Sequence, residues 1–319
     1  MKTNSPEKTY DILTCGDTCV DLVISGSDVT PQFGQVEKLV DDYVLEMGGS
    51  CCLFACQAAK LGLRVGIIGR VGDDDFGRLV VRRLNESGVD TQHVIVDPQI
   101  KTGAGIALAQ GNDRAILTYL GSISAVTRAD VHDDLLAAAR HFHHGSFFLH
   151  KGLRPDIPAL FQKARSLGLS ISLDPNWDPD EAWDSNLLDA LAYTDIFMPN
   201  EQEALLISRQ ATLEAAVAWL AQRGAASLTI KRGEQGARYY STGIREEIRV
   251  QPVSGGDSVG AGDSFDAGFL AGWLRGYSIK TCLAIGAFCG RSTAAQKGGL
   301  AGQPTWTDVL ANGLVEEPA

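Results

Sequence analysis

The sequence has no long hydrophobic run and no excess of basic residues. None of its apolar stretches approaches the ~20 residues that a helix needs to span a bilayer, and the polar start MKTNSPEKTY lacks the apolar segment of a signal peptide. The formal net charge of −11 argues against the basic surface with which proteins bind nucleic acids or anionic membranes. We therefore expect a cytoplasmic protein whose partners include neither nucleic acid nor membrane.

Cysteine is also sparse. The seven cysteines are an odd number without regular spacing, which favours reduced thiols over a disulfide framework. Five of them lie between residues 15 and 56, but structural zinc wants two well-spaced ligand pairs, so we expect these thiols to line a core or a pocket. Among the histidines of residues 141–150 we favour a ligand contact by His150 over a metal site.

What the sequence does contain is a regular alternation of short apolar runs and helical patterns. The apolar runs that predict strands cover residues 12–15, 65–69, 169–173, 196–198 and 227–230. The helical patterns cover residues 50–61, 76–87, 157–167 and 213–223, and another begins at Glu201. With 45% hydrophobic residues in 319, this rhythm predicts one large α/β unit with a mainly parallel sheet covered by helices on both faces.

Two stretches interrupt the alternation. Residues 20–46 are strand-like, with turns near Pro31 and Gly34, and residues 103–119 have the pattern of a hairpin around the turn GND. We interpret them as a small accessory β-sheet with strands drawn from about 19–46 and 98–121. The whole chain, 1–319, is then a single domain.

The segment DSVGAGD, residues 257–263, is the most informative one. An apolar helical pattern follows it, so the turn opens a helix, and the amides of Gly260, Ala261 and Gly262 would point at an anion. A carboxylate beside such a turn would repel a bound anion, so we expect it to take part in the reaction of that anion. We assign to Asp263 the removal of a proton from a hydroxyl that attacks a phosphate. The alternative is a plain helix start with permissive glycines.

Two further loops have features that suit ligand binding. Gly48 and Gly49 precede a helix, and paired glycines let the backbone approach a ligand closely. Residues 174–176, Asp-Pro-Asn, follow an apolar strand at the edge where open α/β sheets bind ligands. Each loop also has a local explanation as a plain turn.

Two more loops would suit a nucleotide and its metal. Asn200 and Glu203 offer oxygen ligands for Mg²⁺, chiefly through its waters. The turn of Gly233 and Gly236 behind Lys231 could hold nucleotide phosphates. The alternatives are an N-cap with acids in the first helical turn and a hairpin turn with surface charges.

In their order along the chain these motifs resemble those of the PfkB, or ribokinase, family of carbohydrate kinases. The glycine pair followed by GRVGDDDFG, residues 69–77, is similar to the N-terminal family signature, and DSVGAGD is similar to the C-terminal one, with Ser258 where Thr is common. LDPN, PNEQE and KRGEQG fall between them in the family's order, and GGLAGQPT resembles its closing loop. The resemblance spans nearly the whole chain.

This resemblance implies a ribokinase-like three-layer α/β/α sandwich, with a mostly parallel central sheet and a small β-sheet lid. It implies a phosphotransferase that moves the γ-phosphoryl group of ATP to a hydroxyl of a small carbohydrate, with Mg²⁺ accompanying ATP. Lid strands commonly pair between subunits in this family, so a homodimer through the lid is expected.

Residue by residue, the resemblance implies Asp263 as the catalytic base and the amides of residues 260–262 as the anion hole. Asp21 matches the aspartate that binds a sugar hydroxyl, and Gly48 and Gly49 match the glycines that contact the substrate.

On the nucleotide side the matching residues are Asn200, Glu203, Lys231, Gly233 and Gly236, of which the first two are tied to Mg²⁺ and the phosphates. Many members also hold a monovalent cation such as K⁺ near the anion hole. The positions that match this site are Asp257 and Val259, with the loop around Gly298 opposite.

Three positions depart from the family pattern and leave the acceptor undetermined. Leu53 takes a substrate-binding position where Asn is usual, and leucine forms no side-chain hydrogen bond. Cys19 stands where Asn is frequent, and Asp178 where several sugar kinases have Arg. Two alternatives stay open: a nucleoside kinase on the same fold, which an apolar Leu53 would suit, and a non-catalytic ligand sensor, against which the intact Asp263 argues.

Overall fold

The main sheet forms the centre of the molecule. The computed structural model describes residues 8–110, 113–253, 256 and 258–315. Within them the sheet order is β13-β12-β11-β10-β9-β8-β1-β4-β5. The strands are β1 (Tyr10–Cys15), β4 (Val65–Gly72), β5 (Val94–Asp97), β8 (Ala139–His144), β9 (Ser170–Leu173), β10 (Ile196–Phe197), β11 (Ser227–Lys231), β12 (Ala237–Ser241) and β13 (Ile244–Ile248). All neighbours from β11 to β5 run parallel, and β12 and β13 add an antiparallel hairpin at one edge.

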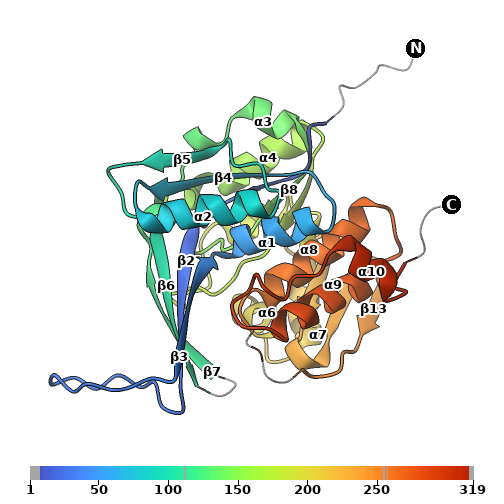
Figure 1. Ribbon diagram of the computed structural model, residues 1–319. Helices are drawn as coiled ribbons and strands as arrows, with labels where there is room; N and C mark the ends of the chain where they lie inside the picture. Colours follow the sequence, from blue (N-terminus) through green and yellow to red (C-terminus); the bar gives the residue numbers. More distant parts are fainter. Residues whose placement is uncertain (1–7, 111–112, 254–255, 257, 316–319) are drawn as a thin grey trace.

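Helices cover both faces of this sheet, as predicted (Figure 1). One buried cluster packs the first face against α1 (Ser50–Lys60), α2 (Asp75–Glu86), α8 (Ala261–Leu274), α9 (Ile279–Ala294) and α10 (Trp306–Ala311). A second cluster packs the other face against α3 (Asp133–Ala137), α4 (Ile157–Ser166), α5 (Leu187–Leu191), α6 (Glu201–Ser208) and α7 (Leu213–Ala221). The three-layer α/β architecture is therefore confirmed. None of the described helices is long and apolar enough to cross a membrane.

A second, four-stranded sheet projects from the main one (Figure 1). Its order is β3-β2-β6-β7, built from β2 (Cys19–Ser25), β3 (Asp42–Gly48), β6 (Gly103–Gln110) and β7 (Asp113–Tyr119). We call this sheet the lid. β2 pairs parallel to β6, and the other two pairings are antiparallel. Residues 26–41 extend beyond the strands as an arm (Figure 1).

The strand β8 did not stand out as an apolar run, because three of its six residues are histidines. They are buried nonetheless, since neighbouring groups satisfy their ring nitrogens. His141 contacts the hydroxyls of Ser170 and Ser172 at 2.7 Å each, and His143 shares Ser172 while its ring stacks on Phe54. Tertiary hydrogen bonds thus replace the apolar pattern that sequence reasoning looks for.

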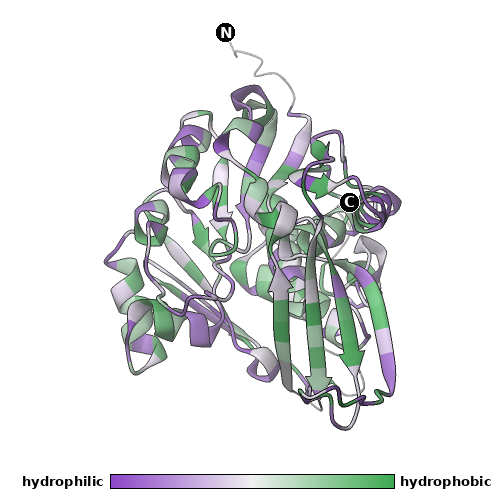
Figure 2. Cartoon of the chain, turned by 90° about the vertical axis from the view of Figure 1, so that its left-hand side faces the viewer, coloured by the Kyte–Doolittle hydropathy of each residue, from purple (hydrophilic) through white to green (hydrophobic). Residues whose placement is uncertain are grey.

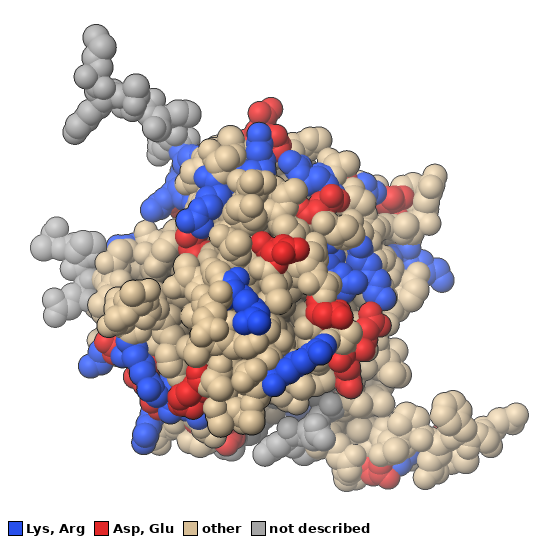
Figure 3. Space-filling view, turned by 180° about the vertical axis from the view of Figure 1, so that it is seen from behind, with Lys and Arg blue, Asp and Glu red and all other residues tan. Residues whose placement is uncertain are grey.

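Charged side chains on the outside are mixed in sign. On the face seen in Figure 3, basic and acidic side chains are interspersed with uncharged surface.

Candidate active site

The site lies where the lid joins the main sheet. β1 ends at Cys15 and β2 of the lid begins at Cys19, so the lid springs from the carboxyl edge of the sheet. The loops after β9, β10 and β11 start at the same edge, because these strands run parallel to β1 through β8. Ligands of open α/β sheets bind at this edge.

The GAG turn opens helix α8, as the sequence predicted. Gly260 is the N-cap residue with a left-handed φ of 68°. A Cβ on Gly260 would lie 3.0 Å from Gly299 Cα and 3.0 Å from Leu53 Cδ1, so the turn packs tightly between the closing loop and helix α1. The first turn of a helix leaves its amide hydrogens without partners inside the helix, at the positive end of the dipole.

Asp263 lies in this first turn and is partly buried. Burial raises the pKa of its carboxyl to about 7, and the negative charge of Asp174 adds to the rise. Lys231 and a hydrogen bond from Ser50 act in the opposite direction. A carboxyl that titrates near neutral pH is suited to accept a proton from a hydroxyl.

Lys231 turns inward from the end of β11. Its Nζ lies 2.5 Å from Asp174 Oδ2 and 2.9 Å from Asp266 Oδ2, and the Asp266 side chain is only 1% exposed. A Cβ on Gly262 would lie 3.7 Å from Lys231 Nζ, so the ammonium group stands beside the GAG turn. Asp266 follows Asp263 by three residues on α8, and sequence reasoning gave it no role.

A chain of hydrogen bonds connects the loops on the other side of Asp263. The side-chain nitrogen Nδ2 of Asn176 donates to Ser50 Oγ at 2.8 Å and to Ser146 Oγ at 3.1 Å. Ser146 Oγ donates to Asp17 Oδ2 at 2.8 Å, and the Asp17 carboxylate also accepts from the backbone amides of Ser50 and Cys51. Asp17 and Ser146 were not among the predicted site residues, although both follow strand ends and carry polar side chains.

The predicted glycine pair is explained by two close approaches. A Cβ on Gly48 would lie 2.2 Å from Asp21 Cγ, and a Cβ on Gly49 would lie 2.1 Å from the carbonyl oxygen of Asp17. Gly105 on β6 gives room to the same carboxylate, because its Cβ would lie 2.5 Å from Asp21 Oδ1. Glycines on both neighbouring strands therefore leave space around Asp21.

Asn200 and Glu203 form a capping box at the start of α6. Asn200 Oδ1 accepts from the Glu203 amide, and Glu203 Oε2 accepts from the Asn200 amide, both at 2.8 Å. Burial raises the pKa of Glu203 to about 7, with a further contribution from the charge of Asp174. The pair thus serves as the helix cap that the sequence allowed as an alternative, while Glu203 adds a further acid to the carboxyl edge.

The loop of Gly233 and Gly236 joins β11 to β12 as a hairpin connection. Both glycines have positive φ, and a Cβ on Gly236 would lie 2.0 Å from the carbonyl oxygen of Ile248. Arg232 donates from Nε to Glu201 Oε2 at 2.8 Å.

The three departures from the family pattern are all buried. Leu53 is 2% exposed and lies against Gly260, and Cys19 Sγ would be 3.2 Å from a Cβ on Gly49. Asp178 accepts the Trp183 amide at 2.7 Å, so its carboxylate stabilises its own loop.

The predicted monovalent-cation positions lie beside the closing loop. Val259 Cγ1 would be 3.3 Å from a Cβ on Gly299, and Gly298 has φ 77° and faces Val44 of the lid. Asp257 lies outside the described residues.

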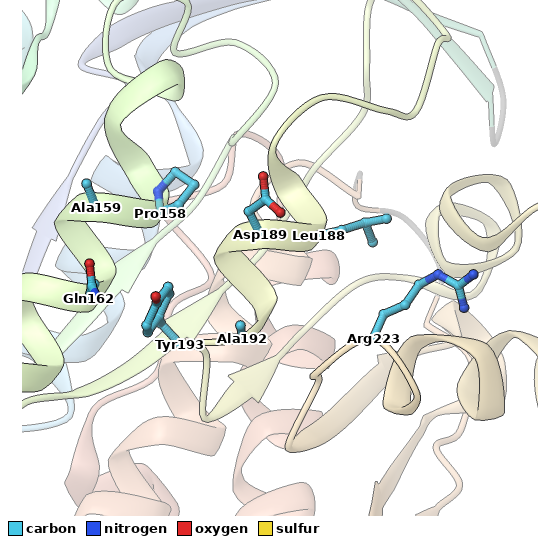
Figure 4. Close-up of a pocket in the computed structure, with 8 residues that line it drawn as sticks. All are labelled: Pro158, Ala159, Gln162, Leu188, Asp189, Ala192, Tyr193 and Arg223. Carbon is cyan, nitrogen blue, oxygen red and sulfur yellow. The ribbon is translucent and has the colours of Figure 1, made fainter.

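A separate hollow of about 540 Å³ lies on the face of the second buried cluster (Figure 4). Pro158 and Gln162 of α4, Leu188 of α5 and Arg223 are among its lining residues. None of the predicted site residues lines it.

Known proteins resemble this chain in both sequence and structure. A family model described as "pfkB family carbohydrate kinase" matches residues 10–306. The probable fructokinase-5 of Arabidopsis thaliana is 28% identical over 316 residues, with 93% of this chain and 95% of the relative covered. The 2-dehydro-3-deoxygluconokinase of Bacillus subtilis (strain 168) is 31% identical over 274 residues, with 79% and 81% covered.

Among solved structures, a Ribokinase II from E. coli in complex with ATP and Mg²⁺ superposes with a TM-score of 0.83 at 27% identity. The superposition covers 95% of this chain and 98% of that protein.

Proposed function

The chain belongs to the pfkB family of carbohydrate kinases and is a sugar kinase, and on this premise we propose that Asp263 is its general base and the amides of residues 260–262 its anion hole. The observation that carries this proposal is the position of Asp263 in the first turn of α8, with a pKa raised to about 7. A carboxyl that titrates near neutral pH and the amides of a first helical turn meet at one point, where a hydroxyl must lose a proton while a phosphoryl group arrives.

In the proposed reaction Asp263 accepts the proton of the acceptor hydroxyl. The hydroxyl oxygen forms a bond to the γ-phosphorus, the bond from that phosphorus to the β,γ-bridging oxygen breaks, and ADP leaves. The amides of the GAG turn stabilise the negative charge on the transferring group. Ser50, which hydrogen-bonds Asp263, holds the base against α1.

The acceptor would lie between Asp263 and the lid. Asp21 is held over Gly48 and Gly105, and Asn176 reaches the same side of the site through Ser50. We assign Asp21 to a sugar hydroxyl and the backbone at Gly48 and Gly49 to close contact with the sugar. Closure of the lid would exclude water and limit ATP hydrolysis.

ATP would lie across the loops that follow β10 and β11, with Asn200, Lys231, Gly233 and Gly236 on the nucleotide side. The donor set fits Mg²⁺, because Asp174, Glu203, Asp263 and Asp266 gather around a single lysine, and Asp266 Oδ1 is buried without a hydrogen-bond partner among the described residues. Since the capping box engages Asn200 and Glu203, these two would reach the ion through its waters. Bound Mg²⁺ would supply neutralisation of phosphate charge.

A monovalent cation beside the anion hole is a further proposal. The adjacency of Val259 to the loop of Gly298 and Gly299 supports it. Its coordination would include Asp257, which lies outside the described residues.

We also propose a homodimer through the lid. The direct pairings Leu22–Leu45, Leu22–Ile106 and Ile106–Leu117 place four apolar residues in one row across the sheet, and the neighbouring rows add Tyr43, Ile24, Leu108 and Tyr119. This face points away from Asp21, since successive residues of a strand alternate.

Much of the apolar face of the lid is exposed, and no other part of the described chain covers its outer strands. Figure 2 shows broad hydrophobic bands along the lid strands, and Leu117 is 59% and Tyr43 69% exposed. Phe33 and Leu39 of the arm are 99% and 88% exposed. A second copy of the chain could cover such an apolar sheet face with the same face of its own lid.

A screen of acceptors tests the function. ADP release from Mg·ATP would be measured with ketoses, pentoses, sugar acids and nucleosides; the names of the two relatives make a ketose and a 2-keto sugar acid the first choices. We expect turnover with one of the sugar classes. Turnover with nucleosides alone would replace the sugar by a nucleoside, and ligand-induced thermal stabilisation without any ADP release would identify a sensor.

A further inference from the structure

Two buried imidazoles behind the proposed active site are joined by a hydrogen bond whose direction is fixed by their other partners. His144 Nδ1 lies 3.0 Å from the carbonyl oxygen of Cys15, which can only accept a hydrogen bond, so this nitrogen carries the hydrogen. In the neutral ring His144 Nε2 is then an acceptor, and His150 Nδ1, 3.2 Å away, donates to it. The remaining nitrogen, His150 Nε2, is left with a free lone pair.

This lone pair has no hydrogen-bond partner among the described residues, although His150 is fully buried. Two other ligand-type atoms stand beside it: Cys51 Sγ and Asp17 Oδ1, and all three atoms lie within 4.8 Å of one another. The nitrogen is 4.0 Å from the Asp17 oxygen. The three residues come from the loop after β1, the first turn of α1 and the loop after β8.

The space beside these atoms depends on Gly16. A Cβ on Gly16 would lie 2.5 Å from Cys51 Sγ and 2.8 Å from His150 Nε2. Any other residue at this position would fill the space between the thiol and the imidazole. The cluster therefore combines an imidazole nitrogen that has no hydrogen-bond partner among the described residues, two further atoms that can bind a metal, and a gap that a side chain at position 16 would close.

We propose that His150 Nε2, Cys51 Sγ and Asp17 Oδ1 form a zinc site. A set of imidazole, thiolate and carboxylate ligands is typical of Zn²⁺ and foreign to Mg²⁺, which takes oxygen ligands. Ligand bonds of ~2.0–2.3 Å require the three atoms to move together by up to about 1 Å. His144 orients the ligand His150 in the way that an outer hydrogen-bond partner fixes the tautomer of a zinc-binding histidine.

Binding releases one proton. The Cys51 thiol loses its hydrogen as the zinc–sulfur bond forms, and the thiolate and the Asp17 carboxylate together balance the 2+ charge. Zinc uptake therefore strengthens with rising pH. The Asp17 carboxylate also accepts from the amides of Ser50 and Cys51, so the ion would bind directly behind the turn that carries Ser50.

The test uses Co²⁺ as a spectroscopic probe on the full-length protein. Incubation with Co²⁺ should give one bound ion for each chain and a thiolate-to-cobalt charge-transfer band, which Zn²⁺ removes by displacement with release of about one proton at first loading. Cys51→Ser should abolish the band. Cys56→Ser, a buried thiol farther along the same helix, is the matched control and should keep it.

A second pair of variants covers the histidine. His150→Gln should lower the affinity for Co²⁺ at least tenfold, as loss of a ligand does, while His141→Gln should leave it unchanged. No charge-transfer band in the folded wild-type protein, or a band that survives Cys51→Ser, would overturn the proposal. Because the readout is metal binding, the site stands or falls independently of the proposed kinase chemistry.

Discussion

Gly48 lies against the carboxylate of Asp21, so closely that a Cβ on Gly48 would stand 2.2 Å from Asp21 Cγ. The two residues belong to neighbouring antiparallel strands of the lid, β3 and β2. A carboxylate that rests on a glycine keeps its position only while that glycine has no side chain. The missing side chain of Gly48 thus leaves room for the Asp21 carboxylate, in addition to letting the backbone approach a ligand.

Gly48→Ala should therefore weaken acceptor binding. The Asp21 carboxylate must swing away, and loss of one charged hydrogen bond of about 1.5–3 kcal/mol raises the KM for the sugar about tenfold or more, while the KM for ATP stays near the wild-type value. Steady-state kinetics with each substrate varied would measure this. Gly26→Ala, at the residue directly after β2 where the new Cβ meets its nearest atom at 3.4 Å, is the control. An unchanged sugar KM in Gly48→Ala would contradict the role of Asp21.

Asp263→Asn should lower kcat by about 10²–10⁴-fold, because an amide cannot accept the hydroxyl proton. The dissociation constant of ATP, measured by calorimetry, should change little, since the GAG amides and the nucleotide loops remain. Near-normal turnover in this variant would remove Asp263 from the role of base.

Ionisation of Asp263 should affect activity and stability in opposite directions. The folded-state pKa of about 7 lies above the ordinary carboxyl value of 3.8, so kcat/KM should rise with pH through about 7 as the base loses its proton. The folded state binds more protons than the unfolded state between these two values, so Asp263 makes the free energy of unfolding fall as pH rises through this window. Thermal unfolding of wild type and Asp263→Asn at pH 5 and pH 8 measures this.

The asparagine variant should gain melting temperature relative to wild type, and the gain should be larger at pH 8 than at pH 5. An equal difference at both pH values would show that Asp263 does not titrate in the folded protein between them.

Lys231→Met should destabilise the fold by about 3–5 kcal/mol, because it leaves the buried carboxylates of Asp174 and Asp266 without their cation. Removal of this charge should also raise the pKa of Asp263 further and shift the pH–rate profile to higher pH. Chemical denaturation and the pH dependence of kcat/KM measure the two effects.

A double-mutant cycle provides the control for this variant. Lys231→Met combined with Asp266→Asn should cost less than the sum of the single changes, because the second change removes one orphaned charge. Strict additivity would mean that the two groups do not interact.

Leu117→Glu should convert a lid-mediated dimer into a monomer, since it places a charge in the middle of the exposed apolar row. Light scattering after gel filtration would report the mass. Val96→Glu, at a position of β5 that is 55% exposed, should leave the assembly unchanged. A wild-type protein that is monomeric at high concentration would contradict the proposed dimer.

Local sequence patterns predicted a large part of this architecture. Gly260 at the N-cap of α8 and the helix that begins at Ser50 follow from short-range rules, because turn glycines and apolar periodicity act within a few residues. The strand β8 escaped these rules, since its histidines are buried by hydrogen bonds to Ser170 and Ser172 of the neighbouring strand.

The sequence by itself determined that an acid follows a glycine turn at the start of a helix, and that other polar loops follow apolar strands, because both features depend on neighbours in the chain. Only the tertiary structure decided that Lys231 turns inward to Asp266, and that His150 meets Cys51 and Asp17. These contacts join residues dozens of positions apart. Their partners are set by the packing of strands and helices, which no local spacing encodes.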